Sequence, residues 1–157
     1  MLLTQGELDR YAHAFSSSDM LRHLGLTCSI SPDGVTIALP EARNEHRGGM
    51  GTQAINGGVM SAMYDFALGN TGILVSPLRR YATVQISLSF ERAVRGSSAR
   101  CVATIDRATA NVVFASARIF DADGTVCSRA TGMLSLGREV SVDEWCVAIA
   151  SHGQKRG

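Results

Sequence analysis

The sequence predicts an α+β fold in which a curled antiparallel sheet wraps around one long central helix. Residues 59–75 are apolar on nearly every side of a predicted helix, which must therefore be covered all round. Residues 83–136 instead alternate apolar and polar side chains with the period of two that is typical of strands. A further hairpin pattern precedes the helix. Because only the sheet is large enough to cover the helix, we expect the sheet to curl around it.

The chain before the central helix begins with helical signals and continues as a hairpin. Thr4 and Glu7 have the spacing of a capping box, and apolar residues follow at helical spacing, so a helix is expected near residues 4–16. A second helical turn is expected around residues 20–23. Apolar and polar residues then alternate on both sides of Pro32-Asp33-Gly34, which predicts a β-hairpin.

Four strands are predicted beyond the helix, and their order along the chain predicts an antiparallel meander. They are expected near residues 83–90, 98–107, 111–120 and 125–136. In the first strand one face is expected to hold Val84, Ile86, Leu88 and Phe90, and the other Thr83, Gln85, Ser87 and Ser89. A helical turn is possible at residues 142–149. We therefore expect a single domain over residues 1–137, with an N-terminal helical segment, and a C-terminal extension over residues 138–157.

Length and composition exclude several classes of protein. A chain of 157 residues has room for one ordinary domain, and a net charge of +1 argues against a large nucleic-acid interface. The four cysteines are widely separated, so neither a zinc site nor a disulfide framework is expected. The start of the chain does not resemble a signal peptide, and Asp65 interrupts the apolar segment, which argues against a membrane span. We expect a cytoplasmic protein without metal or redox cofactor.

Asp65 is the first candidate for chemistry, because it lies in the most apolar stretch of the chain. A carboxylate there is costly to bury unless it is paired or faces a solvent-filled cleft. One interpretation is a structural carboxylate, or one on the solvent-facing side of the helix. The other is a nucleophile or general base at the mouth of a pocket.

Asn56-Gly57-Gly58 is the second candidate, at the predicted start of the same helix. Asn is a favoured N-cap, and glycines leave the first backbone N–H groups uncovered by side chains. Such N–H groups suit an anion or a developing oxyanion, although an ordinary capped helix has the same pattern. Asp65 lies eight residues after Gly57, about 12 Å along a helix. A substrate held at Gly57 is therefore more easily reached by Asp65 of a second chain, which predicts a two-fold dimer.

Residues 51–58, residues 65–69 and the alternating strand at residues 83–90 resemble the hotdog-fold acyl-CoA thioesterases of the phenylacetate-degradation type. The resemblance covers roughly residues 24–136. It implies a hotdog fold, in which a glycine N–H polarises the thioester carbonyl and the helix acid of the partner subunit acts as nucleophile or general base. These roles fall on Gly57 and Asp65. A small hydroxyl residue near the active site corresponds to Thr83, and Gly58 is expected to contact substrate.

The sequence departs from that family at two positions. Asn56 stands where the family usually has His, and an amide cannot become cationic to help a thiolate leave, although it can cap the helix and hydrogen-bond a carbonyl. Met50 stands where the family tends to have Asn or Gln, a role that Gln53 could take over. His46, in a charged loop, is a tempting further base but is expected to be solvated.

The predicted function is hydrolysis of an acyl- or aryl-CoA thioester by a homodimer or tetramer. Asp65 and Gly57 are the expected catalytic groups with Asn56, and Gly58, Gln53 and Thr83 the expected substrate contacts. The departures at Asn56 and Met50 keep a non-catalytic acyl-CoA-binding or regulatory protein as the alternative. An enoyl-CoA hydratase and a purely structural dimerisation module are further alternatives. The predicted helix has no His for the hydratase reaction.

Overall fold

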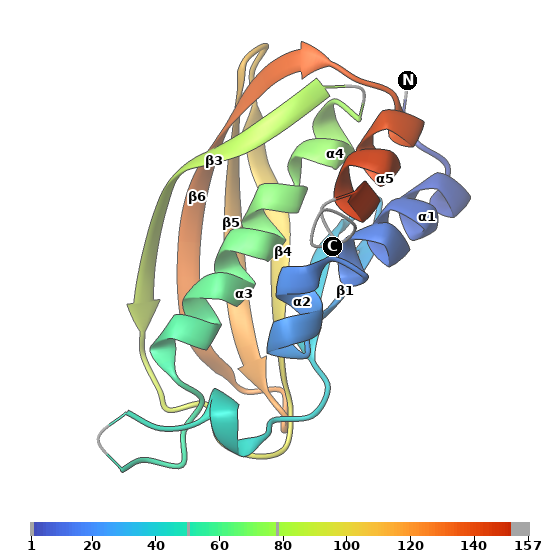
Figure 1. The fold of residues 1–157 in the computed structure, drawn as a ribbon. Helices are drawn as coiled ribbons and strands as arrows, with labels where there is room; N and C mark the ends of the chain where they lie inside the picture. Colours follow the sequence, from blue (N-terminus) through green and yellow to red (C-terminus); the bar gives the residue numbers. More distant parts are fainter. Residues whose placement is uncertain (1, 50, 78, 152–157) are drawn as a thin grey trace.

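A six-stranded antiparallel sheet curls around one helix in the computed structural model, which describes residues 2–49, 51–77 and 79–151 (Figure 1). The predicted α+β class and hotdog architecture are confirmed. The elements, in chain order, are α1 (Gln5–Ser16), α2 (Asp19–Leu24), β1 (Thr27–Ser31), β2 (Gly34–Leu39), a short 3-10 helix η1 (Asn44–His46), α3 (Gly57–Asn70), α4 (Gly72–Val75), β3 (Arg79–Phe90), β4 (Ala99–Ala108), β5 (Val112–Asp121), β6 (Val126–Glu139) and α5 (Val142–Ser151).

Helix α1 begins with the predicted capping box. The backbone N–H of Glu7 donates to the Thr4 hydroxyl at 3.3 Å, and the Glu7 carboxylate accepts from the Thr4 N–H at 2.8 Å. The apolar side of α1 packs against β1, and α1 also contacts α5 near the other end of the chain (Figure 1). The two ends of the described chain therefore pack together on one side of the molecule.

The strand order is β1-β2-β4-β5-β6-β3, so the predicted meander is only partly right. β4, β5 and β6 are consecutive neighbours, but β3 pairs with β6 and not with β4. The connection after β3 passes the start of α3, where Ile55 donates its N–H to the Val94 carbonyl at 2.9 Å. Local hairpin signals cannot reveal this order, because the β3–β6 pairing joins strands far apart in sequence.

Helix α3 lies in the concave face of the sheet and contacts β2, β3, β4, β5 and β6. Its buried residues are Met60, Met63, Tyr64, Ala67, Leu68 and Asn70. The predicted single helix over residues 59–75 is divided into α3 and α4 at Thr71. There the Thr71 N–H and hydroxyl both donate to the Leu68 carbonyl, at 3.0 and 2.7 Å, which tightens the last turn of α3.

A β-bulge in β3 changes which side chains face α3. Thr83 pairs with Leu134 and Gln85 with Met133, so Val84 is an extra residue without its own partner on β6. The expected common face of Val84, Ile86, Leu88 and Phe90 is therefore wrong at Val84, which is 54% exposed. Thr83 instead faces α3. After the bulge Ile86 and Leu88 pack on the core, as expected.

The C-terminal segment forms α5, which extends beyond the helical turn expected at residues 142–149. None of the helices in the described part of the chain is long and apolar enough to cross a membrane.

Candidate active site

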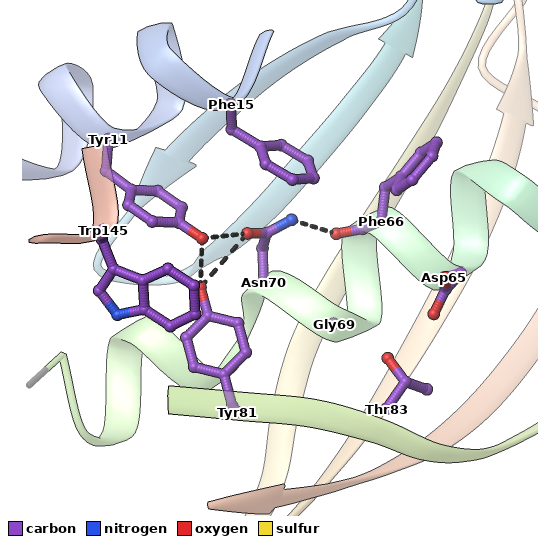
Figure 2. Close-up of a pocket in the computed structure, with 9 residues that line it drawn as sticks. All are labelled: Tyr11, Phe15, Asp65, Phe66, Gly69, Asn70, Tyr81, Thr83 and Trp145. Atoms are coloured by element: carbon purple, nitrogen blue, oxygen red, sulfur yellow. Dashed lines mark hydrogen bonds between the residues drawn. The ribbon is translucent and has the colours of Figure 1, made fainter. Parts of the chain in front are cut away.

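Asp65 lines a cavity of about 250 Å³ between α3, β3 and the two terminal helices (Figure 2). α3 contributes Asp65, Phe66, Gly69 and Asn70, and β3 contributes Tyr81 and Thr83. The remaining walls are Tyr11 and Phe15 from α1 and Trp145 from α5.

The Asp65 side chain is exposed, and none of the described residues forms a hydrogen bond or an ion pair with its carboxylate. The surrounding sequence is apolar because the opposite side of α3 is buried in the core. Asp65 and Gly69 are one helical turn apart and share the side of α3 that faces the cavity. A free carboxylate at a cavity wall is available to a ligand.

Thr83 faces the same end of the cavity as Asp65 (Figure 2). A Cβ on Gly69 would lie 3.1 Å from the Thr83 hydroxyl oxygen, so the glycine allows β3 to approach α3 closely here. The β-bulge is what turns Thr83 toward α3. Its hydroxyl and the Asp65 carboxylate are therefore polar groups on adjoining walls.

A polar cluster lies toward the other end of the cavity. Tyr11 donates its hydroxyl to the Asn70 side-chain oxygen at 2.8 Å and also contacts the Tyr81 hydroxyl. The Asn70 amide nitrogen donates to the Phe66 carbonyl at 2.7 Å. Burial raises the pKa of both tyrosines, so their hydroxyls stay protonated well into the alkaline range. The cluster fixes α1, α3 and β3 relative to one another.

Aromatic rings form most of the remaining wall. The Trp145 ring centroid lies 5.0 Å from that of Tyr81 and 6.1 Å from that of Tyr11. Phe15 is stacked on Tyr11 at 6.3 Å and meets Phe66 edge-on at 5.9 Å. The sequence did not indicate these five residues as parts of the site, because the aromatic cluster brings α1 and α5, from opposite ends of the chain, against α3 and β3. Trp145 carried one signal, as the only tryptophan of the chain.

Gly57 is the first residue of α3, and Asn56 is its N-cap as predicted. The Asn56 side-chain oxygen accepts from the Gly58 N–H at 2.7 Å, and its amide nitrogen donates to the Gly48 carbonyl at 3.1 Å. No described residue accepts a hydrogen bond from the Gly57 N–H. Of the two glycine N–H groups, the one at Gly57 is therefore available to a ligand, whereas the cap uses that of Gly58.

Gly57 and Asp65 face different cavities in one chain. The hollow at Gly57 is lined by Ile55, Met60 and the 90–94 segment, and the Phe90 ring covers the glycine, since a Cβ there would lie 3.2 Å from the ring. None of these residues lines the Asp65 cavity. The two candidate groups thus do not meet within one described chain.

Three further positions bear on the expected site. Gln53 is exposed and receives a hydrogen bond from Arg47 at its backbone carbonyl, at 2.9 Å. Met50 lies outside the described residues. His46 was expected to be solvated, and this is wrong: it is 2% exposed. It accepts from the Arg43 N–H at 2.9 Å and contacts the Leu24 carbonyl at 2.8 Å. His46 thus holds the loop to α2.

The described residues include no group of three or more His, Cys, Asp and Glu side chains placed as metal ligands. The four cysteines are free.

The helix wrapped by a curled sheet, with an acid on the helix and a capped glycine pair at its start, defines a hotdog-fold protein. Residues 52–128 match the family model of the thioesterase superfamily. The resemblance found in the sequence is thereby confirmed.

Solved structures of several bacterial proteins are similar to the chain. The PaaI protein from the phenylacetic acid degradation operon of Escherichia coli superposes with a TM-score of 0.76 at 12% identity, over 87% of this chain and 98% of that chain. A protein of Shewanella oneidensis related to the thioesterase superfamily gives 0.75 at 22% identity, over 87% and 100%. A thioesterase from Haemophilus influenzae gives 0.73 at 19% identity, over 87% and 92%. No curated protein matches the chain by sequence.

Proposed function

We propose that the protein hydrolyses acyl-CoA thioesters, with Asp65 as nucleophile or general base. The observation that carries this proposal is the free Asp65 carboxylate at the wall of a cavity with an otherwise largely apolar lining. An acyl or aryl group is suited to such a lining, and the exposed carboxylate is free to act on a thioester carbonyl bound there.

Gly57 is the proposed oxyanion donor. Its N–H has no described partner, and the positive end of the α3 dipole favours negative charge at that point. Asn56 holds Gly58 and the Gly48 loop, so its proposed role is to position the Gly57 N–H. This assignment allows the site to work with an amide in place of the histidine usual in the family.

A two-fold dimer would bring the two groups together. Within the described residues β3 pairs only with β6, so its other edge, twelve residues long, is open to pairing. Antiparallel pairing of two such edges, centred between Ile86 and Ser87, sets Thr83 near the partner's Phe90. Because Thr83 lies beside Asp65 and Phe90 covers Gly57, Asp65 would then approach the partner's Gly57.

The proposed reaction consumes water. Either Asp65 removes a proton from water as it attacks the carbonyl carbon, or its carboxylate attacks first and water hydrolyses the resulting mixed anhydride. In both routes the C–S bond breaks, and the CoA thiolate leaves and takes up a proton. The products are a free carboxylic acid and CoA.

The test is thioester hydrolysis by purified protein on a panel of acyl- and aryl-CoA esters. Asp65→Asn is expected to lower kcat by about 10²–10⁴-fold, the range for loss of a general base, with an unchanged unfolding midpoint because the carboxylate has no described partner. Asp123→Asn, in the exposed β5–β6 turn, is the matched control. Binding of esters without turnover would favour the acyl-CoA-binding alternative, and no binding at all would exclude both.

A further inference from the structure

The cavity at Asp65 has two chemically different ends. Asp65 and Thr83 lie at one end, whereas Tyr11, Tyr81 and Trp145 gather at the other, with Asn70 between (Figure 2). Asn70 follows Asp65 by five residues, which is about 7.5 Å along the helix. At about 250 Å³ the cavity lies below the roughly 300–1,000 Å³ typical of pockets for drug-sized ligands, so it suits a short group.

We propose that the two terminal helices set the upper size limit of the acyl group, with Trp145 of α5 as the residue that determines specificity and Tyr11 of α1 as its support. This inference rests on the proposed thioesterase function. A short acyl or single-ring aryl group would fill the space between Asp65 and Trp145. A longer chain would have to displace the indole.

Trp145 is held by packing alone. Its ring contacts those of Tyr81 and Tyr11, and no described residue is a hydrogen-bond partner of its buried Nε1. Tyr11 and Tyr81, in contrast, are fixed through Asn70. A smaller side chain can therefore replace Trp145 without breaking a hydrogen bond of the tyrosine cluster. Substitution at this position is thus expected to enlarge the cavity.

The contacts around Trp145 also connect α5 to the rest of the chain. The ion pairs of α5, Arg10–Asp143, Arg138–Glu144 and Arg80–Glu144, are between exposed side chains, which contribute little to stability. Between the described aromatic rings, α5 contacts the rest of the chain through the Trp145 indole, which packs against Tyr81 and Tyr11. The same side chain thus joins α5 to α1 and β3 and lines the end of the cavity.

The residues of this end wall lie mostly outside the matched family region. Tyr11 and Phe15 precede residues 52–128, and Trp145 follows them, whereas Asp65, Gly57 and Thr83 lie inside. The reacting groups and the size limit are therefore in different parts of the sequence. Substitutions in the terminal helices are expected to change which acyl group is accepted without removing the reacting groups.

The first experiment compares hydrolysis of benzoyl-, hexanoyl- and dodecanoyl-CoA by the unmodified protein, Trp145→Ala and Trp145→Phe. Trp145→Ala is expected to raise the ratio of kcat/KM for the dodecanoyl ester over the benzoyl ester by at least about 10-fold, with Trp145→Phe between the two, because discrimination by an apolar wall falls in this range. Val147→Ala is the matched control, since Val147 lies on the same helix and is 66% exposed. An unchanged ratio in folded Trp145→Ala would overturn the inference and leave the proposed function intact.

The second experiment needs no turnover and no substitution at Trp145. Because Trp145 is the only tryptophan, the tryptophan fluorescence of Asp65→Asn protein, excited where tyrosine does not absorb, reports on this end of the cavity. Benzoyl-CoA is expected to change the emission, and CoA without an acyl group is not. If calorimetry shows that benzoyl-CoA binds but the emission does not change, the inference that Trp145 limits the acyl group is refuted, and the proposed function is not. Absence of binding by any ester would refute both the limit and the proposed function.

Discussion

The ring of Tyr81 lies directly over Gly72: a Cβ on this glycine would stand 2.6 Å from the Tyr81 Cγ. Real Cβ atoms do not come this close, so a side chain at Gly72 would have to move the ring or the start of α4. The ring cannot yield easily, because its hydroxyl contacts Tyr11 and its face packs on Trp145. A glycine in a helix is thus required by the contact between α4 and β3.

Gly72→Ala is expected to destabilise the protein by about 1–3 kcal/mol, the usual cost of overpacking, although alanine has the higher helix propensity. Gly6→Ala in α1 is the matched control, because a Cβ there meets nothing within 4 Å. It is expected to stabilise the protein by about 0.5–1 kcal/mol. Urea unfolding of both variants measures the difference. Equal effects of the two substitutions would show that Tyr81 yields freely.

Gly57→Pro is expected to lower kcat by about 10²–10³-fold while leaving the protein folded, because proline removes the N–H proposed to bind the oxyanion. The first position of a helix tolerates proline, and Asn56 already has the extended backbone (ψ 139°) that a residue before proline requires. Gly57→Ala places a Cβ at the same distance from Phe90 but keeps the N–H, so it is the matched control. Steady-state kinetics on one acyl-CoA ester measure kcat for both variants. An equal loss in both variants would assign the effect to Phe90 and not to the N–H.

A shared site between subunits has its own consequence. Asp65→Asn and Gly57→Pro are each expected to inactivate their homodimers, but a heterodimer of the two retains one site with both groups intact. Mixed and re-associated subunits should therefore recover activity up to about half that of the unmodified dimer on a per-heterodimer basis. Differential tags allow the heterodimer to be isolated and assayed. Inactive heterodimers of confirmed composition would argue for sites formed within single subunits.

The proposed reacting groups of the candidate site were more predictable than its shape. Asp65 and Asn56-Gly57-Gly58 are visible in the sequence because a carboxylate in an apolar helix and a glycine pair after an N-cap are local signals. Their separation along α3 follows from helical geometry, and their location in different cavities agrees with it. Short sequence patterns were therefore sufficient to indicate these candidate groups.

The walls of the cavity depend on contacts that local patterns do not contain. No glycine or proline near Val84 indicates the bulge in the sequence. Because of the bulge, Thr83 faces α3, whereas strict alternation would place it on the opposite face from Ile86 and Leu88. Tyr11 and Trp145 are 134 positions apart in the printed sequence and meet only because α1 and α5 pack on the same side. The burial of His46 likewise depends on the Leu24 carbonyl, which another segment supplies.

The stability of the protein is expected to fall at alkaline pH, in part through Cys28. Burial raises the pKa of this thiol from 9.0 to about 12. In the unfolded chain the thiol ionises first, so its contribution to folding is complete below pH 9 and is lost as the pH rises toward 12. The loss is at most about 1.4 kcal/mol per pH unit over that interval. Burial also raises the pKa of Tyr64 to about 12, so Cys28 is one of several groups that act in the same direction.

Cys28→Ala isolates the contribution of this thiol to the loss of stability at alkaline pH. The variant is expected to lose a constant amount of packing energy at every pH, but its free energy of unfolding should decline less steeply between pH 9 and 12 than that of the unmodified protein. Urea unfolding followed by circular dichroism across this interval, with reductant present, measures both slopes. Because Tyr64 and the other titrating groups are common to the two proteins, the difference in slope belongs to Cys28. Parallel curves would mean that the thiol ionises in the folded protein as readily as in the unfolded chain, and that the residues packed around Cys28 do not shield it from water.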